Sequence, residues 1–344
     1  MDRKSFLGTA SALAAGLSLP LKRSLAAAPA DDELTTYKKP PYLKPGDTIG
    51  ITSPAGTITI KEMQPAISLI QAWGYTVKMG TSIGKKDFTF GGTDDERRAD
   101  LQSMLDDADL KAIMCARGGY GSVRIVDGLN WKKFRERPKW VIGFSDITVL
   151  HNHIHTVCGV ASLHSKMTNS FPDDWSKAEP VQIETIESIH DALTGKRMKY
   201  AAIPNDNNRR GVAEGVLVGG NLKTIESLAA SPSDIKTDGK ILFVEDTGEY
   251  LYSIDRMFWN LKRTGKLKAI KALIVGGFKI KEDDPGEEFG RSLMDIVLEK
   301  VKDYQYPVCF DFPVGHQKAN FALKCGVKHR LSVNENETTL TEII

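Results

Sequence analysis

At residues 141–146 the sequence reads Val-Ile-Gly-Phe-Ser-Asp. The run Trp140 to Gly143 is short and apolar and predicts a buried strand, and Ile147 to Thr156 predicts a helix. A serine between such a strand and helix lies on a tight turn at the carboxyl edge of a sheet. Free N–H groups at the helix amino terminus stabilise negative charge there. Ser145 is therefore a candidate nucleophile, and the backbone N–H of Asp146 is a candidate oxyanion donor.

The serine turn departs in one respect from the G-x-S-x-G pattern of a nucleophile elbow. Ile147 stands where that pattern has its second glycine. Ser145 could equally be the N-cap of the following helix, with Thr148 one turn further on. The spacing of these residues leaves both interpretations open.

Strand-like and helical runs alternate on both sides of this stretch. A helix over 61–73 is expected to end at Gly74, and a helix over 93–106 is expected to begin at its cap Thr93. This alternation predicts an α/β domain with a parallel sheet that helices cover on both faces. The expected strands are 47–53, 75–79, 112–116 and 140–143, and the other expected helices are 123–129 and 147–156.

The pattern changes near Phe171, where Pro, Asp and Trp become frequent. We expect residues 31–170 to form the first domain, 171–210 a linker that contains a helix over 181–193, and 211–344 a second domain. The second domain is expected to contain strands at 211–218, 240–245, 269–276 and 307–311 and helices at 253–262 and 291–301.

The first thirty residues have the layout of a secretory signal peptide. Arg3 and Lys4 precede an apolar run from Phe6 to Leu19, and small residues suited to a signal peptidase follow at 26–30. The apolar run is too short for a comfortable membrane span. Arg3-Lys4-Ser5-Phe6-Leu7 also resembles a twin-arginine signal with lysine in the second position. The alternative is a disordered or membrane-associated tail. We expect an exported, periplasmic protein without a stable membrane span.

Composition and charge exclude several classes of protein. The 344 residues are 26% charged and 41% hydrophobic, as in ordinary globular proteins. Residues 1–30 hold four of the 46 basic residues and one of the 44 acidic ones, which leaves a formal net charge of −1 for the rest. No basic block with interleaved aromatic residues occurs, so nucleic acid is a poor candidate partner.

Cysteine and histidine spacing does not predict a metal site. The four cysteines lack C-x-x-C spacing, and no disulfide is predicted from them. His151, His153 and His155 could suggest a metal, but only two of the three could share a helix face. These four cysteines are Cys115, Cys158, Cys309 and Cys325.

Three further stretches carry candidate chemistry. Arg117-Gly118-Gly119-Tyr120-Gly121 follows a strand and is either a plain turn or a source of oxyanion donors, with Arg117 near a substrate carboxylate. Glu245 and Asp246 follow an apolar strand, and either could orient a histidine, although a solvated turn would look the same. His316 follows another strand-like run and is a candidate general base, although a lone loop histidine is more often simply exposed.

Taken in order, these motifs resemble the LD-carboxypeptidase family of serine peptidases. The resemblance runs from about Tyr42 to Leu323 and rests on five stretches in the same order. They are Lys-Pro-Gly-Asp-Thr-Ile at 44–49, Arg-Gly-Gly-Tyr-Gly at 117–121, Gly-Phe-Ser-Asp at 143–146, Val-Glu-Asp-Thr-Gly-Glu at 244–249 and Pro-Val-Gly-His at 313–316, supported by Gly-Gly-Asn-Leu at 219–222 and Tyr-Ser-Ile-Asp-Arg-Met at 252–257.

The resemblance implies a Ser-Glu-His triad and a substrate. Ser145 matches the family nucleophile, Glu245 the triad acid and His316 the base. The N–H groups of Asp146 and of a glycine in the loop, Gly118 or Gly119, would form the oxyanion hole. The family fold joins an amino-terminal α/β domain to a smaller β-rich α/β domain. Members of the family use no metal or other cofactor and are commonly dimeric.

The same resemblance implies removal of the terminal D-Ala, after an L-centre, from muropeptide tetrapeptides. Two alternatives stay open. One is an amide hydrolase of the microcin-C-immunity type, and the other is a non-catalytic periplasmic peptide-binding protein. Family members are usually cytoplasmic, so a signal peptide would be a departure and would imply work on wall fragments outside the inner membrane.

Overall fold

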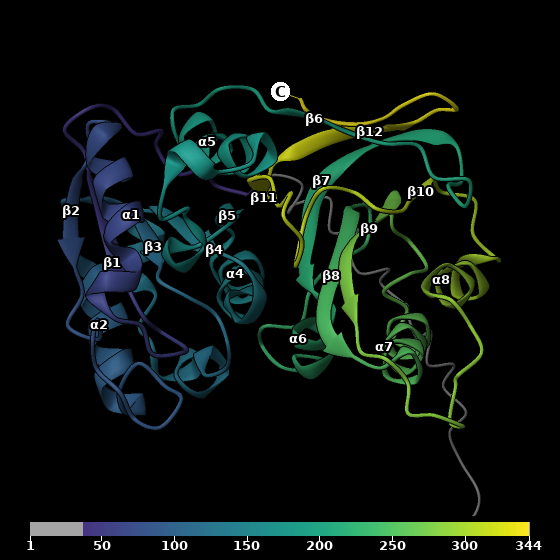
Figure 1. Cartoon of the computed structure of the whole chain (residues 1–344), viewed down its shortest axis with the longest axis horizontal. Coiled ribbons are helices and arrows are strands. Elements are labelled where there is room, and N and C mark those ends of the chain that lie inside the picture. The colour runs from purple at the N-terminus through teal and green to yellow at the C-terminus, as the bar shows by residue number, and fades with distance from the viewer. Residues whose placement is uncertain (1–36, 344) are drawn as a thin grey trace, which may run out of the picture. The chain divides into compact units, whose positions relative to one another are not determined.

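Two β-sheets organise the described part of the chain, residues 37–343 of the computed structural model (Figure 1). The first sheet has six strands in the order β11-β5-β4-β3-β1-β2, and the second has seven in the order β10-β9-β8-β7-β12-β13-β6. Both sheets belong to one structural unit. The expected signal peptide, 1–30, lies outside the described residues. None of the helices within residues 37–343 is both long and apolar enough to cross a membrane.

The first sheet is parallel except at one edge, where β11 runs antiparallel to β5. Its strand residues alternate between two apolar faces: Trp140 and Ile142 pack with α1, whereas Val141 packs with α2 and α4. Because both faces are apolar, helices cover both, as the sequence predicts. The elements are β1 Thr48–Thr52, α1 Ile60–Ala72, β2 Thr76–Met79, α2 Asp94–Asp106, β3 Leu110–Cys115, α3 Lys132–Glu136, β4 Trp140–Gly143, α4 Thr148–His153, β5 Ser162–His164 and β11 Leu323–Cys325.

Two expected helices are shorter or less regular than predicted. The run 123–129 forms two 3-10 turns, Ser122–Arg124 and Val126–Gly128, in place of one α-helix. Gly128 lies so close to Arg98 that a Cβ there would meet the Arg98 side chain at 2.7 Å. The run 147–156 begins as a 3-10 turn, continues as α4 and ends as the π-helical segment Ile154–Cys158.

The second sheet combines four parallel strands with an antiparallel extension. Strands β7 to β10 are parallel, and β12, β13 and β6 add to β7 in antiparallel fashion. Helices α6, α7 and α8 pack on one face through residues such as Val244 and Phe258. The elements are α5 Pro180–Leu193, β6 Lys199–Ala202, β7 Gly211–Asn221, α6 Leu222–Ser227, β8 Ile241–Glu249, α7 Leu251–Arg263, β9 Ala272–Ile280, α8 Leu293–Val301, β10 Val308–Cys309, β12 Lys328–Val333 and β13 Thr338–Glu342.

One hydrophobic core is shared by the two sheets. Ile142 and Leu163 of the first sheet and Phe243 and Ile274 of the second belong to the same buried cluster. Alternate residues of β8 therefore serve different cores, since Leu242 and Val244 face α7 and α8. This shared core fixes the carboxyl ends of β4 and β8 relative to each other.

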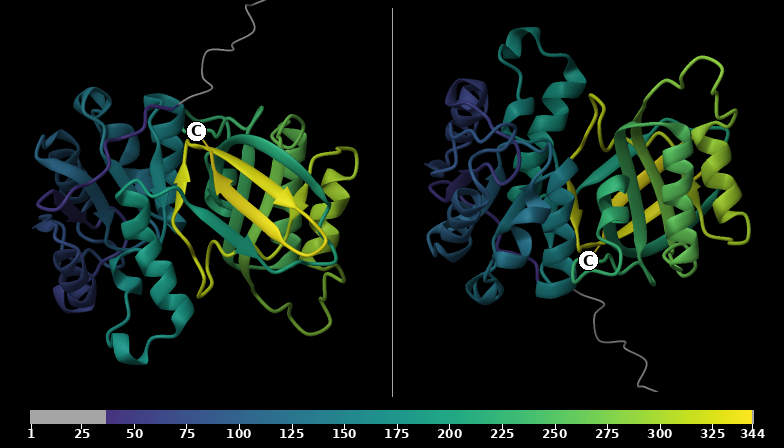
Figure 2. Two further views of the ribbon diagram at one scale, coloured as in Figure 1. Left: turned by 90° about the horizontal axis from the view of Figure 1, so that it is seen from above. Right: turned by 90° about the horizontal axis from the view of Figure 1, so that it is seen from below.

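The structure departs from the predicted division of the chain at two points. Strand β6 lies inside the expected linker, 171–210, yet pairs with β13 of the second sheet. Strand β11 lies inside the expected second domain, 211–344, yet pairs with β5 of the first sheet. Figure 2 shows the segment that contains β11, in yellow, lying against the teal part of the chain. Both strands are short and are held by partners more than 100 residues away, which the local sequence pattern does not reveal.

Candidate active site

The serine turn places Ser145 in a strained backbone conformation. Its φ is 62°, in the left-handed region that residues other than glycine seldom adopt. The N-cap of α4 is Ile147, so Ser145 does not hold the N-cap position that the sequence left open. Ile147 is fully buried, and a Cβ on Gly143 would lie 3.0 Å from both of its γ carbons. The absence of a side chain at Gly143 thus accommodates isoleucine where the usual elbow has glycine.

The glycine loop 117–121 passes directly over Ser145. A Cβ on Gly118 would lie 3.1 Å from the Cβ of Ser145 and 3.3 Å from its Oγ. Gly119 has a φ of 103°, which suits glycine. The carbonyl of Gly118 accepts a hydrogen bond from the Gly56 N–H at 3.1 Å. The backbone of the loop is therefore held within reach of the serine side chain.

Asp146 ties the serine turn to the glycine loop. Its buried carboxylate Oδ2 accepts a hydrogen bond from the Ser122 N–H at 2.8 Å, immediately after the loop. Burial raises the pKa of Asp146, and the hydrogen bonds from Ser122 oppose that rise. The side chain of Asp146 thus positions the loop, while its backbone N–H stays the expected oxyanion donor.

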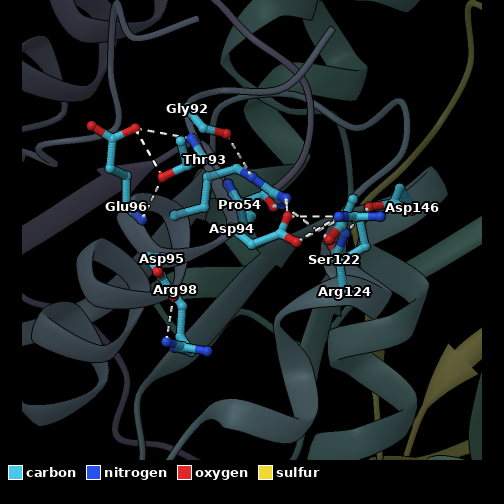
Figure 3. A network of polar contacts seen from close by, with 12 residues as sticks. Pro54, Gly92, Thr93, Asp94, Asp95, Glu96, Arg98, Ser122, Arg124 and Asp146 are labelled. Carbon is cyan, nitrogen blue, oxygen red and sulfur yellow. Dashed lines mark hydrogen bonds and ion pairs between the residues drawn. The ribbon is translucent and has the colours of Figure 1, made fainter. Parts of the chain in front are cut away.

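A buried arginine fastens the glycine loop from its other side. Arg97 has no exposed surface and donates from Nη1 to the carbonyls of Pro54, at 2.5 Å, and Gly121, at 3.0 Å. Its Nε donates to the carbonyl of Gly92 at 3.2 Å. Asp94 forms ion pairs with both Arg97 and Arg124. Figure 3 shows this network, in which Ser122 and Asp146 lie beside Asp94 and Arg124.

The side chain of Arg117 is only partly available to a ligand. Its Nη1 donates to the carbonyl of Thr57 at 3.0 Å, and its buried Nε has no hydrogen-bond partner. The guanidinium therefore lies along the loop that begins at Gly56. Its expected role in binding a substrate carboxylate stays a prediction.

Glu245 and His316 form a direct pair. The Nδ1 of His316 donates to Oε2 of Glu245 over 2.5 Å, with the glutamate fully buried and the histidine 16% exposed. With Nδ1 as donor, Nε2 of the neutral ring is free to accept a proton. Gly315 makes the approach possible, since a Cβ there would lie 2.4 Å from the Cβ of Glu245. The Gly315 N–H also donates to Oδ1 of Asn320 at 2.8 Å, which fixes the loop.

Glu245 lies inside β8, whereas the predicted strand, 240–245, ended at this residue. Strand β8 continues to Glu249, because its polar end still pairs with β9. The pairing with β9 shifts register between Val244 and Asp246. This irregularity lies at Glu245, next to the last residue of β7, Asn221.

The two carboxylates that the sequence could not separate point to different partners. Asp246 accepts hydrogen bonds from the Asn221 side chain at 3.1 Å and from the backbone N–H groups of Lys223 and Thr247 at 2.8 and 2.7 Å. Burial raises the pKa of Asp246 to about 6. Asp246 therefore anchors the start of α6, and Glu245 is the carboxylate that faces the histidine.

The serine turn and the Glu245–His316 pair meet through the residues next to them. The ring of Phe144 lies 5.0 Å from that of His316, between centroids. The Asn221 N–H donates to Oγ1 of Thr148 at 3.0 Å, and a Cβ on Gly220 would overlap that side chain. Among the described side chains no hydrogen bond joins Ser145 to His316, and such bonds are often long before substrate binds.

The three histidines of the α4 region are structural. His151 bonds the carbonyl of Gly143, His153 the hydroxyl of Ser233 and His155 the hydroxyl of Ser162, each at 2.9 Å. Burial lowers the pKa of all three. Within residues 37–343 no group of three or more potential ligands is arranged to hold a metal. All four cysteines are free thiols, and Cys115, Cys309 and Cys325 are buried.

One charged residue at this edge is absent from the site residues predicted from the sequence. Lys166 follows β5, and its Nζ donates to the carbonyl of Gln317 at 2.7 Å, beside His316. It also lies 5.6 Å from the centre of the Phe144 ring. Burial lowers its pKa to about 8. The apolar run before His164 was the available signal, since a strand there would end at the same edge as β4.

Two models of one protein family match separate parts of the chain. Residues 49–165 match the model of the LD-carboxypeptidase N-terminal domain, and residues 214–331 match that of the LD-carboxypeptidase C-terminal domain. A Bacillus subtilis protein named as a probable murein peptide carboxypeptidase is 31% identical over 88% of this chain and 94% of its own length.

Two further relatives carry different names. A crystal structure of muramoyltetrapeptide carboxypeptidase from Oxalobacter formigenes superposes with a TM-score of 0.75 at 26% identity, over 86% of this chain and 98% of that one. The microcin self-immunity protein of Escherichia coli is 26% identical over 86% of this chain and 94% of its own length. The expected resemblance to this group of proteins is thereby confirmed.

Proposed function

Because the chain belongs to the LD-carboxypeptidase family, we propose that it is a serine carboxypeptidase of murein peptides with Ser145, His316 and Glu245 as its catalytic triad. The observation that carries the proposal is the 2.5 Å bond between Glu245 and His316, placed next to a serine turn whose φ is 62°. The partial exposure of Ser145 and His316 supports access by a substrate.

The proposed reaction has two balanced steps. Oγ of Ser145 bonds to the scissile carbonyl carbon while Nε2 of His316 takes the hydroxyl proton. The C–N bond then breaks, and His316 returns that proton to the departing amine. Water attacks the resulting ester by the same route and releases Ser145. Glu245 holds the ring with Nε2 toward the serine and stabilises the imidazolium.

The oxyanion of each tetrahedral intermediate would be bound by backbone N–H groups. Those of Asp146 and of Gly118 or Gly119 are the proposed donors, because the loop backbone lies against the Ser145 side chain. Serine, histidine and backbone groups supply all the steps, so we expect activity to persist in a chelator. As substrate we propose the L,D-linked tetrapeptide of muropeptides, from which terminal D-Ala is released. The names of the Bacillus and Oxalobacter relatives support this choice.

Replacing the proposed nucleophile is the direct test. Ser145→Ala should abolish D-Ala release from a muropeptide tetrapeptide, measured by mass spectrometry as conversion of tetrapeptide to tripeptide. Ser68→Ala is the matched control, because Ser68 is an exposed residue of α1. Circular dichroism should show both variants folded. D-Ala release by folded Ser145→Ala would contradict the proposal.

A second candidate is amide hydrolysis of the microcin-immunity type. The Escherichia coli relative, which covers nearly the same residues, is the observation that favours it. Parallel assays with a muropeptide tetrapeptide and an acylated aminoacyl nucleotide separate the two by their kcat/KM values. A fluorophosphonate probe that labels the wild type but not Ser145→Ala would exclude a non-catalytic peptide-binding protein.

We further propose that the protein is exported and acts on peptidoglycan fragments in the periplasm as a homodimer. Residues 1–30 support export by their basic start, apolar run and small residues. Amino-terminal sequencing of the protein from cells would test this, and an amino terminus at Met1 would contradict it. Sedimentation analysis would test the dimer.

A further inference from the structure

A cavity of about 370 Å³ lies beside the proposed general base. Lys166, Lys279 and Lys318 line it, together with Gln317, the residue that follows His316. Residues 316–318 thus include the proposed general base, His316, and two residues that line the cavity, Gln317 and Lys318. No acidic residue is among the described residues that line it.

The positive charge that lines this cavity is only partly balanced by acidic residues of the protein. Lys318 is paired with Glu179 at 2.5 Å. Lys279 is exposed and has no acidic partner within ion-pair distance among residues 37–343. Lys166 donates to the Gln317 carbonyl, which occupies one of the three donors of its ammonium. Burial and the neighbouring Lys279 lower the pKa of Lys166, and the charge of Glu245 opposes them. Two cations that face a cavity without an acid form a site for an anion.

In the proposed mechanism, the departing residue of the substrate is the part that lies next to this cavity. His316 must protonate the departing amine, so the departing residue lies on the histidine side of the scissile bond. The oxyanion lies on the opposite side, toward the loop that carries Arg117. The α-carboxylate of a terminal residue is only two bonds from its amine nitrogen. It therefore lies near His316, where Lys166 and the Gln317 backbone are in contact.

We propose that the lysine cavity binds the free α-carboxylate of the departing terminal residue, with Lys166 and Lys279 as specificity-determining residues. This rests on the proposed function and moves carboxylate recognition away from Arg117. It also gives a physical reason for cleavage at chain ends only. A carboxylate is a charged acceptor for two ammonium groups, whereas an internal peptide presents a neutral amide and continues as a chain.

The test compares two substrates that differ only at the terminal group. One is the muropeptide tetrapeptide with a free terminal carboxylate, and the other is the same peptide with a terminal carboxamide. Lys166→Gln keeps a donor for the Gln317 carbonyl and removes the charge. It should lower kcat/KM for the acid by about 10- to 100-fold and leave the amide nearly unchanged, as expected for loss of a charged hydrogen bond.

Further variants keep the proposal testable if the Lys166→Gln protein does not fold. Lys279→Gln changes an exposed side chain and should reduce the acid-to-amide preference without disturbing the core. Lys302→Gln removes one exposed charge after α8 and is the matched control, with no expected change in preference. Arg117→Gln should lower the two rates together.

The outcomes separate this inference from the function on which it rests. A fall in the acid-to-amide ratio in Lys166→Gln and Lys279→Gln, but not in Lys302→Gln, supports it. An unchanged ratio in both lysine variants, or loss of the preference in Arg117→Gln, overturns the inference while the carboxypeptidase assignment stands. If the wild type cleaves neither peptide, the proposed function itself is wrong and the inference falls with it.

Discussion

The strained backbone of Ser145 predicts an unusual stability difference between two inactive variants. Ser145→Ala and Ser145→Gly both remove the hydroxyl, so neither should release D-Ala. They differ in how well they tolerate a φ of 62°. Glycine adopts this region freely, whereas alanine carries a Cβ that clashes with the following carbonyl.

The expected size of the difference follows from two opposing contributions. The left-handed conformation costs a residue with a Cβ about 1–2 kcal/mol. Glycine costs about 0.5–1 kcal/mol relative to alanine, because it loses more backbone freedom on folding. Ser145→Gly should therefore be more stable than Ser145→Ala by about 0.5–1 kcal/mol.

Ser68 supplies the matched control, because it lies on an exposed helical position in α1. There glycine should be less stable than alanine by about 1 kcal/mol. The difference between glycine and alanine should thus change sign between the two sites. Urea unfolding followed by circular dichroism measures all four free energies of unfolding. If glycine is less stable than alanine by the same amount at Ser145 as at Ser68, the strain argument is wrong.

Three other predictions concern the surroundings of the serine turn and the buried histidines. Gly143→Ala should cost about 1–3 kcal/mol by crowding Ile147, and Ile147→Ala should relieve part of that cost in a double-mutant cycle of unfolding free energies; purely additive costs would contradict this. Glu245→Gln should lower kcat by about 10³- to 10⁴-fold with little change in melting temperature, and near-wild-type turnover would remove Glu245 from the triad. Burial lowers the pKa of His151, His155 and His329 to about 4, 3 and 4, respectively. The folded protein therefore keeps these side chains neutral near pH 5, whereas in the unfolded chain, where their pKa is near 6.5, they take up three protons. These three groups should therefore lower the stability as the pH falls below 6, contributing about 4 kcal/mol per pH unit near pH 5, while the raised pKa of Asp246 acts in the opposite direction. Urea unfolding at a series of pH values measures the sum, and a flat profile would refute the prediction.

The elements that the sequence predicted well are those with local signals. Thr93 caps α2 and forms a capping box with Glu96, so the start of that helix is determined within four residues. The apolar run at 140–143 forms β4 at the predicted residues. Such features depend on neighbours along the chain, which a single sequence displays directly.

The elements that were missed depend on distant partners. Strands β5 and β11 have three residues each and pair with each other across about 160 positions. Without this pairing, three residues are too few to establish a strand, although the run before His164 is apolar. The omission of β5 also hid Lys166, since only the end of that strand places it beside His316.

The candidate site shows the same limit at finer scale. The sequence presented Glu245 and Asp246 as equivalent acids after a strand. Their separation arises from the irregular pairing of β8 with β9 and from Asn221, which binds Asp246. These are tertiary contacts, so only the folded chain assigns one carboxylate to the histidine.

The return of β11 to the first sheet has a consequence for synthesis on the ribosome. The edge of β5 stays open until residues 323–325 have emerged, about 160 residues after β5 itself. His316 lies seven residues before that closing strand. The segment that completes the sheet of the serine therefore also delivers its proposed base. On the proposed triad, the nascent chain therefore carries no working nucleophile until this segment has been made and folded, and hydrolytic activity begins only then.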